Sequence, residues 1–133
     1  MIGKARRLKN YDQLDFELLL QFLVGRKIYV TPGVMAEVTN LAKYVTDFKY
    51  EEFITANLEG LKKISEQYIP KNMVLDIDFF PRFGYTDTSI AVAANQMKAD
   101  VLTDDFPLRG QCKKLGLKTV NLDELRERAQ QLI

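Results

Sequence analysis

The chain has 133 residues, with 19 Lys and Arg against 18 Asp and Glu, a formal net charge of +1 and 47% hydrophobic residues. This size and balance predict one domain with a sizeable core rather than a disordered chain, and they give no global attraction to nucleic acid. The absence of histidine and the presence of one cysteine exclude Ser-His and Cys-His nucleophile pairs, and zinc sites built on imidazole or several thiolates.

The cysteine count and the lengths of the apolar runs indicate the cellular compartment. The single cysteine, Cys112, excludes a disulfide within the chain, which fits a reducing compartment. No apolar run approaches the roughly 18–20 residues of a membrane span, and no secretory signal opens the chain. We therefore expect a cytoplasmic protein that does not contact a membrane.

The first half of the chain predicts three helices and one short strand, after a basic tail or loop over residues 1–10. The helices are expected over residues 12–24, 32–45 and 48–67, and the strand over residues 27–30. Asp12 is a candidate N-cap and Gly25 a stop signal for the first helix, and Thr31 with Pro32 opens the second.

The second half alternates helix and strand after an ambiguous stretch at residues 73–85, which reads as a strand fragment or an ordered loop. Helices are expected over residues 86–98, 106–114 and 122–132, and strands over residues 100–103 and 117–120. This alternation is typical of an α/β domain in which helices flank a mostly parallel sheet. We take residues 1–133 as a single domain.

Four carboxylates occupy positions that suggest chemistry. Asp104 and Asp105 follow a predicted strand, and ligands of open α/β sheets bind at that end. Glu37 lies on or beside the apolar stripe of its helix, and Asp87 opens a helix. Each also has a simpler explanation. One of Asp104 and Asp105 could simply cap the next helix, and Glu37 could reach solvent from the edge of the stripe. Asp87 could have no role beyond the ordinary electrostatics of a helix end. If a parallel sheet brings them together, oxygen ligands without histidine suit Mg²⁺ or Mn²⁺.

Three motifs in this order resemble the PIN domain family of metal-dependent ribonucleases, which includes the toxins of bacterial toxin–antitoxin pairs. The motifs are TPGVMAEVTNLA, GYTDTSIAVAA and VLTDD, and the resemblance covers about residues 27–121. It implies that Glu37, Asp87 and Asp105 are metal ligands, with Asp104 as the competing choice for the last, and that Thr103 lies beside the metal. Arg109 or Lys98 would then hold substrate phosphates.

The family's first element, an apolar central strand that ends in a metal-binding aspartate, has no counterpart in this sequence. Lys4, Arg6, Arg7 and Lys9 could not fill a buried strand. Three explanations remain open: a shortened version of a longer protein, a gap closed by rearrangement or by a partner chain, and an inactive family member. Because a central gap would leave backbone groups of its neighbours unpaired, we expect a homo-oligomer, unless strands 28–30 and 101–103 pair directly.

The resemblance implies a Mg²⁺- or Mn²⁺-dependent endoribonuclease in which metal-activated water hydrolyses a phosphodiester. The metal is expected to bind weakly or not at all, because one principal ligand is missing. The partners it implies are RNA and a protein antitoxin. The alternative is a catalytically inactive PIN-like module that binds RNA or protein.

Overall fold

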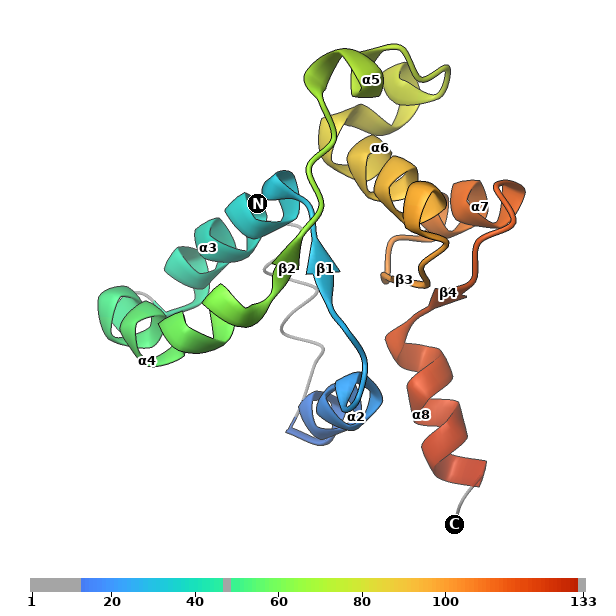
Figure 1. Ribbon diagram of the computed structural model, residues 1–133. Coiled ribbons are helices and arrows are strands. Elements are labelled where there is room, and N and C mark those ends of the chain that lie inside the picture. The colour runs from blue at the N-terminus through green and yellow to red at the C-terminus, as the bar shows by residue number, and fades with distance from the viewer. Residues whose placement is uncertain (1–12, 47–48, 132–133) are drawn as a thin grey trace.

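The computed structural model describes residues 13–46 and 49–131, which form an α/β arrangement of helices and short parallel strands (Figure 1). The elements in chain order are α2 (Gln13–Leu23), β1 (Tyr29–Val30), α3 (Pro32–Thr46), α4 (Tyr50–Lys63), β2 (Ser65–Glu66), α5 (Lys71–Leu75), α6 (Phe80–Met97), β3 (Val101–Leu102), α7 (Phe106–Lys114), β4 (Thr119–Val120) and α8 (Leu122–Gln131). The expected α/β class is therefore confirmed. The expected tail at residues 1–10 and the Asp12 cap lie outside the described residues.

The strands form two separate parallel pairs. In the first pair Tyr29 lies opposite Ser65, and in the second Val101 lies opposite Thr119. Within the described ranges no ladder joins the two pairs, so the direct pairing of strands 28–30 and 101–103 is not observed. Among the described residues, the structure therefore has two separate two-stranded parallel sheets instead of the one mostly parallel sheet expected from the sequence.

Local signals explain where several helices begin and end. Thr31 caps α3 through its hydroxyl, which accepts a hydrogen bond from the Val34 backbone N–H at 3.3 Å. Gly25, at φ 76°, terminates the turn after α2. Residues 106–114 form a helix with the expected bounds.

Two expectations were wrong. The helix expected over residues 48–67 ends at Lys63, and Ser65 and Gln67 donate backbone hydrogen bonds to Ile28 and Val30 instead. Their polar sequence gave no strand signal, and pairing with β1 decides the conformation. Residues 73–85 contain neither a strand nor a long loop but α5 and the start of α6, which breaks at Gly84 with φ 83° and ψ 179°. That conformation is open essentially only to glycine.

Helix α6 is the centre of the core. Its two sides contribute to two clusters of buried side chains, one shared with β3 and α7 and the other with the segment around α5. The clusters consist of Ala91, Ala94, Val101, Leu108, Cys112 and Leu117, and of Ile69, Val74, Val92 and Ala93. By contrast α4 has no buried residue. None of the helices in the described ranges has the length and apolar character needed to cross a bilayer.

Candidate functional site

The N-terminal turn of α3 packs directly on α6. A Cβ added at Gly33 would lie 3.1 Å from Oγ1 of Thr86, which is tighter than most Cβ contacts, so any side chain here would require Thr86 to shift by a few tenths of an ångström. Glu37 lies one turn after Gly33 and therefore on the same side of α3, while Asp87 follows Thr86 in α6. The two helices that carry Glu37 and Asp87 are thus in contact at the turns that bear these acids. Both side chains are partly buried.

Asp87 lies in the turn that follows the Gly84 break, as expected for an acid at a helix start. Its charge acts on Cys112 of α7: burial, and secondarily the negative charge of Asp87, raise the pKa of the Cys112 thiol. Asp87 is thus related to α7 through its charge, and α6, which carries it, contacts α3 at the neighbouring Thr86.

The two strand-end aspartates both act as caps. Asp105 is the N-cap of α7, where its Oδ1 accepts a hydrogen bond from the Leu108 backbone N–H at 2.8 Å. Oδ1 of Asp104 accepts from the Leu122 backbone N–H, at the start of α8, at 3.0 Å. The Thr103 hydroxyl accepts from the Asp105 backbone N–H at 3.1 Å. Asp104 and Asp105 therefore each cap a helix, which is the simpler explanation for the adjacent aspartates. Each cap hydrogen bond uses one carboxylate oxygen.

The two expected phosphate-binding residues also make contacts within the protein. Arg109 donates through Nη2 to Oε1 of Glu124 at 3.0 Å, and its buried Nε has no hydrogen-bond partner. Lys98 ends α6 in the left-handed conformation, with φ 53°, and its Nζ donates to Oδ1 of Asn95 at 3.2 Å. Arg109 has one unused donor, whereas exposed Lys98 lies at the far end of α6.

The donors present do not complete a metal site. Among the described residues, no three Asp, Glu or Cys side chains form a group that could hold a cation. Divalent Mg²⁺ or Mn²⁺ held by protein oxygens needs several such ligands. Glu37 and Asp87 would supply two positions on facing helices, and a further donor would have to reach them.

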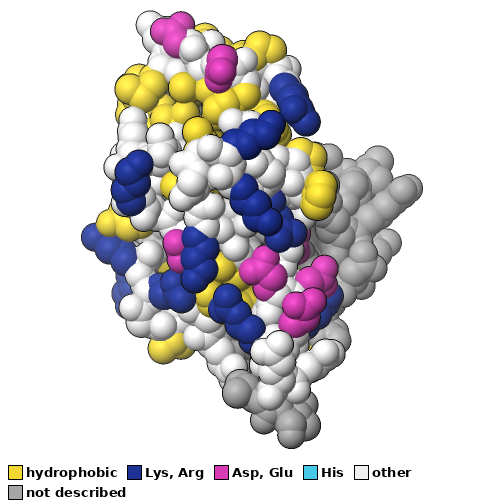
Figure 2. Space-filling model, turned by 90° about the vertical axis from the view of Figure 1, so that its right-hand side faces the viewer, with side chains coloured by type: hydrophobic (Ala, Val, Ile, Leu, Met, Phe, Trp, Pro, Cys, Tyr) yellow, Lys and Arg dark blue, Asp and Glu magenta, His cyan; other side chains and the backbone are white. Residues whose placement is uncertain are grey.

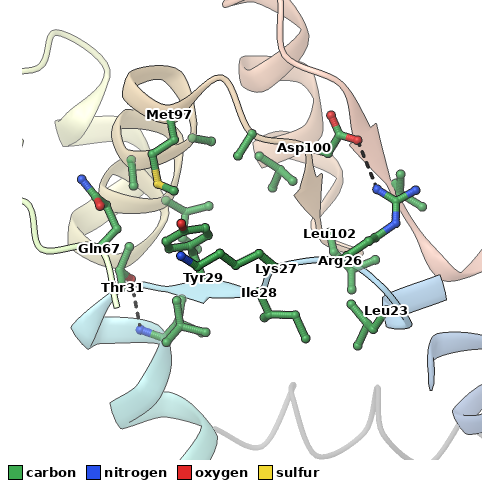
Figure 3. A pocket seen from close by; sticks show the side chains of 18 of the residues that line it. Leu23, Arg26, Lys27, Ile28, Tyr29, Thr31, Gln67, Met97, Asp100 and Leu102 are labelled. Carbon is green, nitrogen blue, oxygen red and sulfur yellow. Dashed lines mark hydrogen bonds and ion pairs between the residues drawn. The ribbon is translucent and has the colours of Figure 1, made fainter. Parts of the chain in front are cut away.

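A groove separates the two strand pairs. Its volume is about 720 Å³, and β1, β3, the end of α2 and one side of α6 line it. Figure 3 shows Tyr29 and Met97 reaching into it from opposite sides, with Lys27 beside the Tyr29 ring. Among the described residues, this opening separates the two parallel strand pairs.

Sequence reasoning missed three structural features near these residues. It did not find β2, which has polar residues, or the contact between Gly33 and Thr86, for which a glycine near a helix start is a weak signal. It also missed the buried hydroxyl groups of Thr88 and Thr119, which have no hydrogen-bond partner. No local pattern distinguishes a buried threonine from an exposed one.

Comparison with known proteins adds no further constraint on the site. No family model matches the sequence, and no curated protein and no solved structure matches it.

Proposed function

We propose that the chain is a PIN-like endoribonuclease domain dependent on Mg²⁺ or Mn²⁺, with an acidic site built around Glu37 and Asp87 that lacks one ligand. The observation that carries this proposal is the contact of Gly33 with Thr86, because it joins the two helix turns that bear these acids. The parallel strand pairs and the order of the motifs are consistent with it. The substrate would be RNA, and a protein antitoxin is the partner class that the resemblance implies.

The surface near α7 is compatible with an RNA backbone. Figure 2 shows the side on which α7 and α8 lie, where Lys and Arg side chains cross the middle of the face with Asp and Glu side chains among and below them. Lys113 and Lys114 form the basic last turn of α7. Cations on one face attract phosphates in a salt-dependent manner. This surface would hold RNA, and the acids would act on it.

The test is cleavage of a fluorescent single-stranded RNA by the full chain in Mn²⁺, with EDTA as the blank. We expect slow cleavage above the blank, and a loss of roughly 10–100-fold in Glu37→Gln and Asp87→Asn. Glu52→Gln, on the exposed side of α4, is the matched control and should leave the rate unchanged. Cleavage that persists in EDTA, or in both site variants, would contradict the proposal.

A second candidate is a catalytically inactive module that binds RNA. The observation in its favour is that Asp104 and Asp105 are both used as helix caps, with no three-donor group among the described residues. Fluorescence anisotropy with the same RNA distinguishes the two. Binding that is insensitive to EDTA, without cleavage in Mn²⁺, would favour the module.

A further inference from the structure

The two strand pairs expose backbone edges to the same groove. In a parallel ladder, the N–H and C=O of one residue point to one side and those of the next residue to the other. Ile28 and Val30 accept hydrogen bonds from β2, so the backbone groups of Tyr29 point away from β2. Val101 and Thr103 donate to β4, so those of Leu102 point away from β4. Tyr29 and Leu102 both line the groove.

The floor of this groove is apolar. It is formed by one side of α6, with Ile90, Ala93, Ala94 and Met97. Ala93 and Ala94 are small and nearly buried, so the helix backbone lies close beneath the opening. Tyr29 and Leu102 are 38% and 42% exposed and both line the groove. Among the described residues, apolar surface therefore occurs here together with two strand edges that no other strand pairs with.

We propose that this groove binds an extended segment of a separate polypeptide, which adds a strand between β1 and β3. A peptide fits better than a compact small molecule because each wall offers the backbone N–H and C=O of a strand residue, Tyr29 on one side and Leu102 on the other. Strand addition of this kind takes its affinity from main-chain hydrogen bonds and its specificity from alternate side chains. Alternate apolar residues of the segment would pack on α6.

Charge at one end of the groove specifies the segment further. Arg26, Lys27 and Lys98 line the end where β1 and β3 begin, and Asp100 is the one acid among the described residues that line the groove. Arg26 reaches Asp100 at 3.8 Å, and its guanidinium also lies over the Phe22 ring, 4.2 Å from the centroid. Three cations against one anion favour acidic residues in the ligand. For a segment parallel to both strands, these acids precede its apolar part.

The directions of β1 and β3 set a condition on an inserted strand. Figures 1 and 3 show that β1 and β3 do not run side by side but point in different directions. Adjacent strands of a sheet rotate by roughly 20–25°, so the two neighbours of an inserted strand differ by roughly 40–50°. Binding of the segment therefore requires β1 and β3 to adopt about this angle. The ion pair of Arg26 with Asp100, at 3.8 Å, joins the residues that precede the two strands.

A second copy of the chain is a weaker candidate for the occupant. In the described part of the chain all four strands already pair along one edge, so no whole strand is spare for a neighbouring copy. The expected homo-oligomer therefore becomes a competing outcome of the test. Neither outcome depends on the proposed nuclease activity, because binding is measured without RNA cleavage.

The experiment is hydrogen exchange of the full chain with and without a synthetic peptide of about eight residues. The peptide carries an acetylated end, two aspartates, and then alternating valine and threonine. We expect the amides of Tyr29 and Leu102 to exchange rapidly in the free chain and at least about tenfold more slowly with peptide. The amides of Val101 and Thr103, which donate to β4 at 2.9 and 3.0 Å, are internal controls and should be protected in both states.

Two variants separate edge pairing from side-chain contact. Leu102→Pro removes the N–H that faces the groove, together with the leucine side chain, but it removes no donor to the β4 segment, because Val101 and Thr103 make those hydrogen bonds. We expect it to weaken peptide binding by about tenfold, the effect of losing one backbone hydrogen bond. Leu102→Ala keeps the donor and should weaken binding less. If Leu102→Pro fails to fold by circular dichroism, the exchange comparison in the unmodified chain decides alone.

Control peptides define what would overturn the proposal. A peptide with proline at alternate positions cannot pair and should not protect the Tyr29 or Leu102 amides, and lysines in place of the aspartates should weaken binding. Equal protection by the proline peptide would show non-specific apolar contact. No protection by the acidic peptide at millimolar concentration would refute a strand site. Protection that rises with protein concentration alone, with dimers in ultracentrifugation, would assign the groove to a second copy.

Discussion

The guanidinium of Arg126 in α8 donates to both carboxylate oxygens of Asp15 in α2, with Nε 2.7 Å from Oδ1. The Asp15 side chain is 4% exposed, whereas that of Arg126 is 38% exposed and also reaches Asp123. The hydrogen bond that Arg126 donates to Asp15 is the main cause that raises the pKa of Arg126. This two-point contact between residues 111 positions apart joins α2 to α8.

Arg126→Ala should lower the free energy of unfolding by about 3 kcal/mol, because it removes the guanidinium from a buried carboxylate. Urea denaturation measures the change, and Arg128→Ala, on an exposed position of the same helix, is the control with little effect. The double variant Asp15→Leu with Arg126→Leu should recover most of the loss, since two apolar side chains can replace such a pair. A double variant less stable than Arg126→Ala would show that the contact is not the cause.

Asp105 offers a way to separate capping from metal binding. Asp105→Ala removes the acceptor for the Leu108 N–H and should cost about 1 kcal/mol of stability. Asp105→Asn keeps an acceptor oxygen and should be nearly as stable as the parent. If Asp105 also binds Mn²⁺, Asp105→Asn should still lose metal affinity in calorimetry. Equal metal binding by the parent and Asp105→Asn would limit Asp105 to its role as a cap.

The sequence predicts a helix, strand or turn of this protein where the residues of that segment alone determine its conformation. Thr31 and Gly25 act at helix ends as their residue types suggest, and the hydrophobic run at Val101 forms a strand. Ser65–Glu66 forms a strand because β1 is beside it, which its own polar residues do not indicate. The same limit applies to the site. The sequence singled out Glu37 and Asp87, but only the contact of Gly33 with Thr86 relates one to the other.

The stability of the protein should depend on pH through Cys112. Because burial raises the pKa of this thiol in the folded state, the unfolded chain loses its proton first as the pH rises. Stability should therefore be at its full value below the ordinary thiol pKa of about 8.5 and fall above it. Urea midpoints at about pH 7 and about pH 9.5 measure the fall.

Two variants test whether the Cys112 thiol causes this loss of stability at high pH. Cys112→Ala removes the thiol and should remove this part of the pH dependence. Asp87→Asn removes the charge that contributes to the raised pKa of the Cys112 thiol, so the fall should become smaller without disappearing. A fall of unchanged size in Cys112→Ala would trace it to other groups, such as tyrosines and lysines.

The contact between α3 and α6 should make a substitution at Gly33 more costly than the same substitution at Gly60. At Gly60 in α4 an added Cβ meets nothing within 4 Å, so Gly60→Ala should raise the free energy of unfolding by about 0.5–1 kcal/mol. At Gly33 the added Cβ would lie 3.1 Å from the Thr86 hydroxyl, so Gly33→Ala should lose that gain, and Gly33→Val should be destabilised by about 1–3 kcal/mol.

The same pair of positions tests whether this contact matters for the acids. Because Gly33→Val must move α3 away from α6, it should also shift Glu37 relative to Asp87 and lower Mn²⁺ affinity in calorimetry. Thr86→Ala removes the nearest obstacle and should relieve part of the destabilisation when combined with Gly33→Val. Gly60→Ala should leave Mn²⁺ binding unchanged. If Gly33→Val folds and binds Mn²⁺ as the parent does, Glu37 and Asp87 do not share a ligand, and the nuclease proposal loses the observation that carries it.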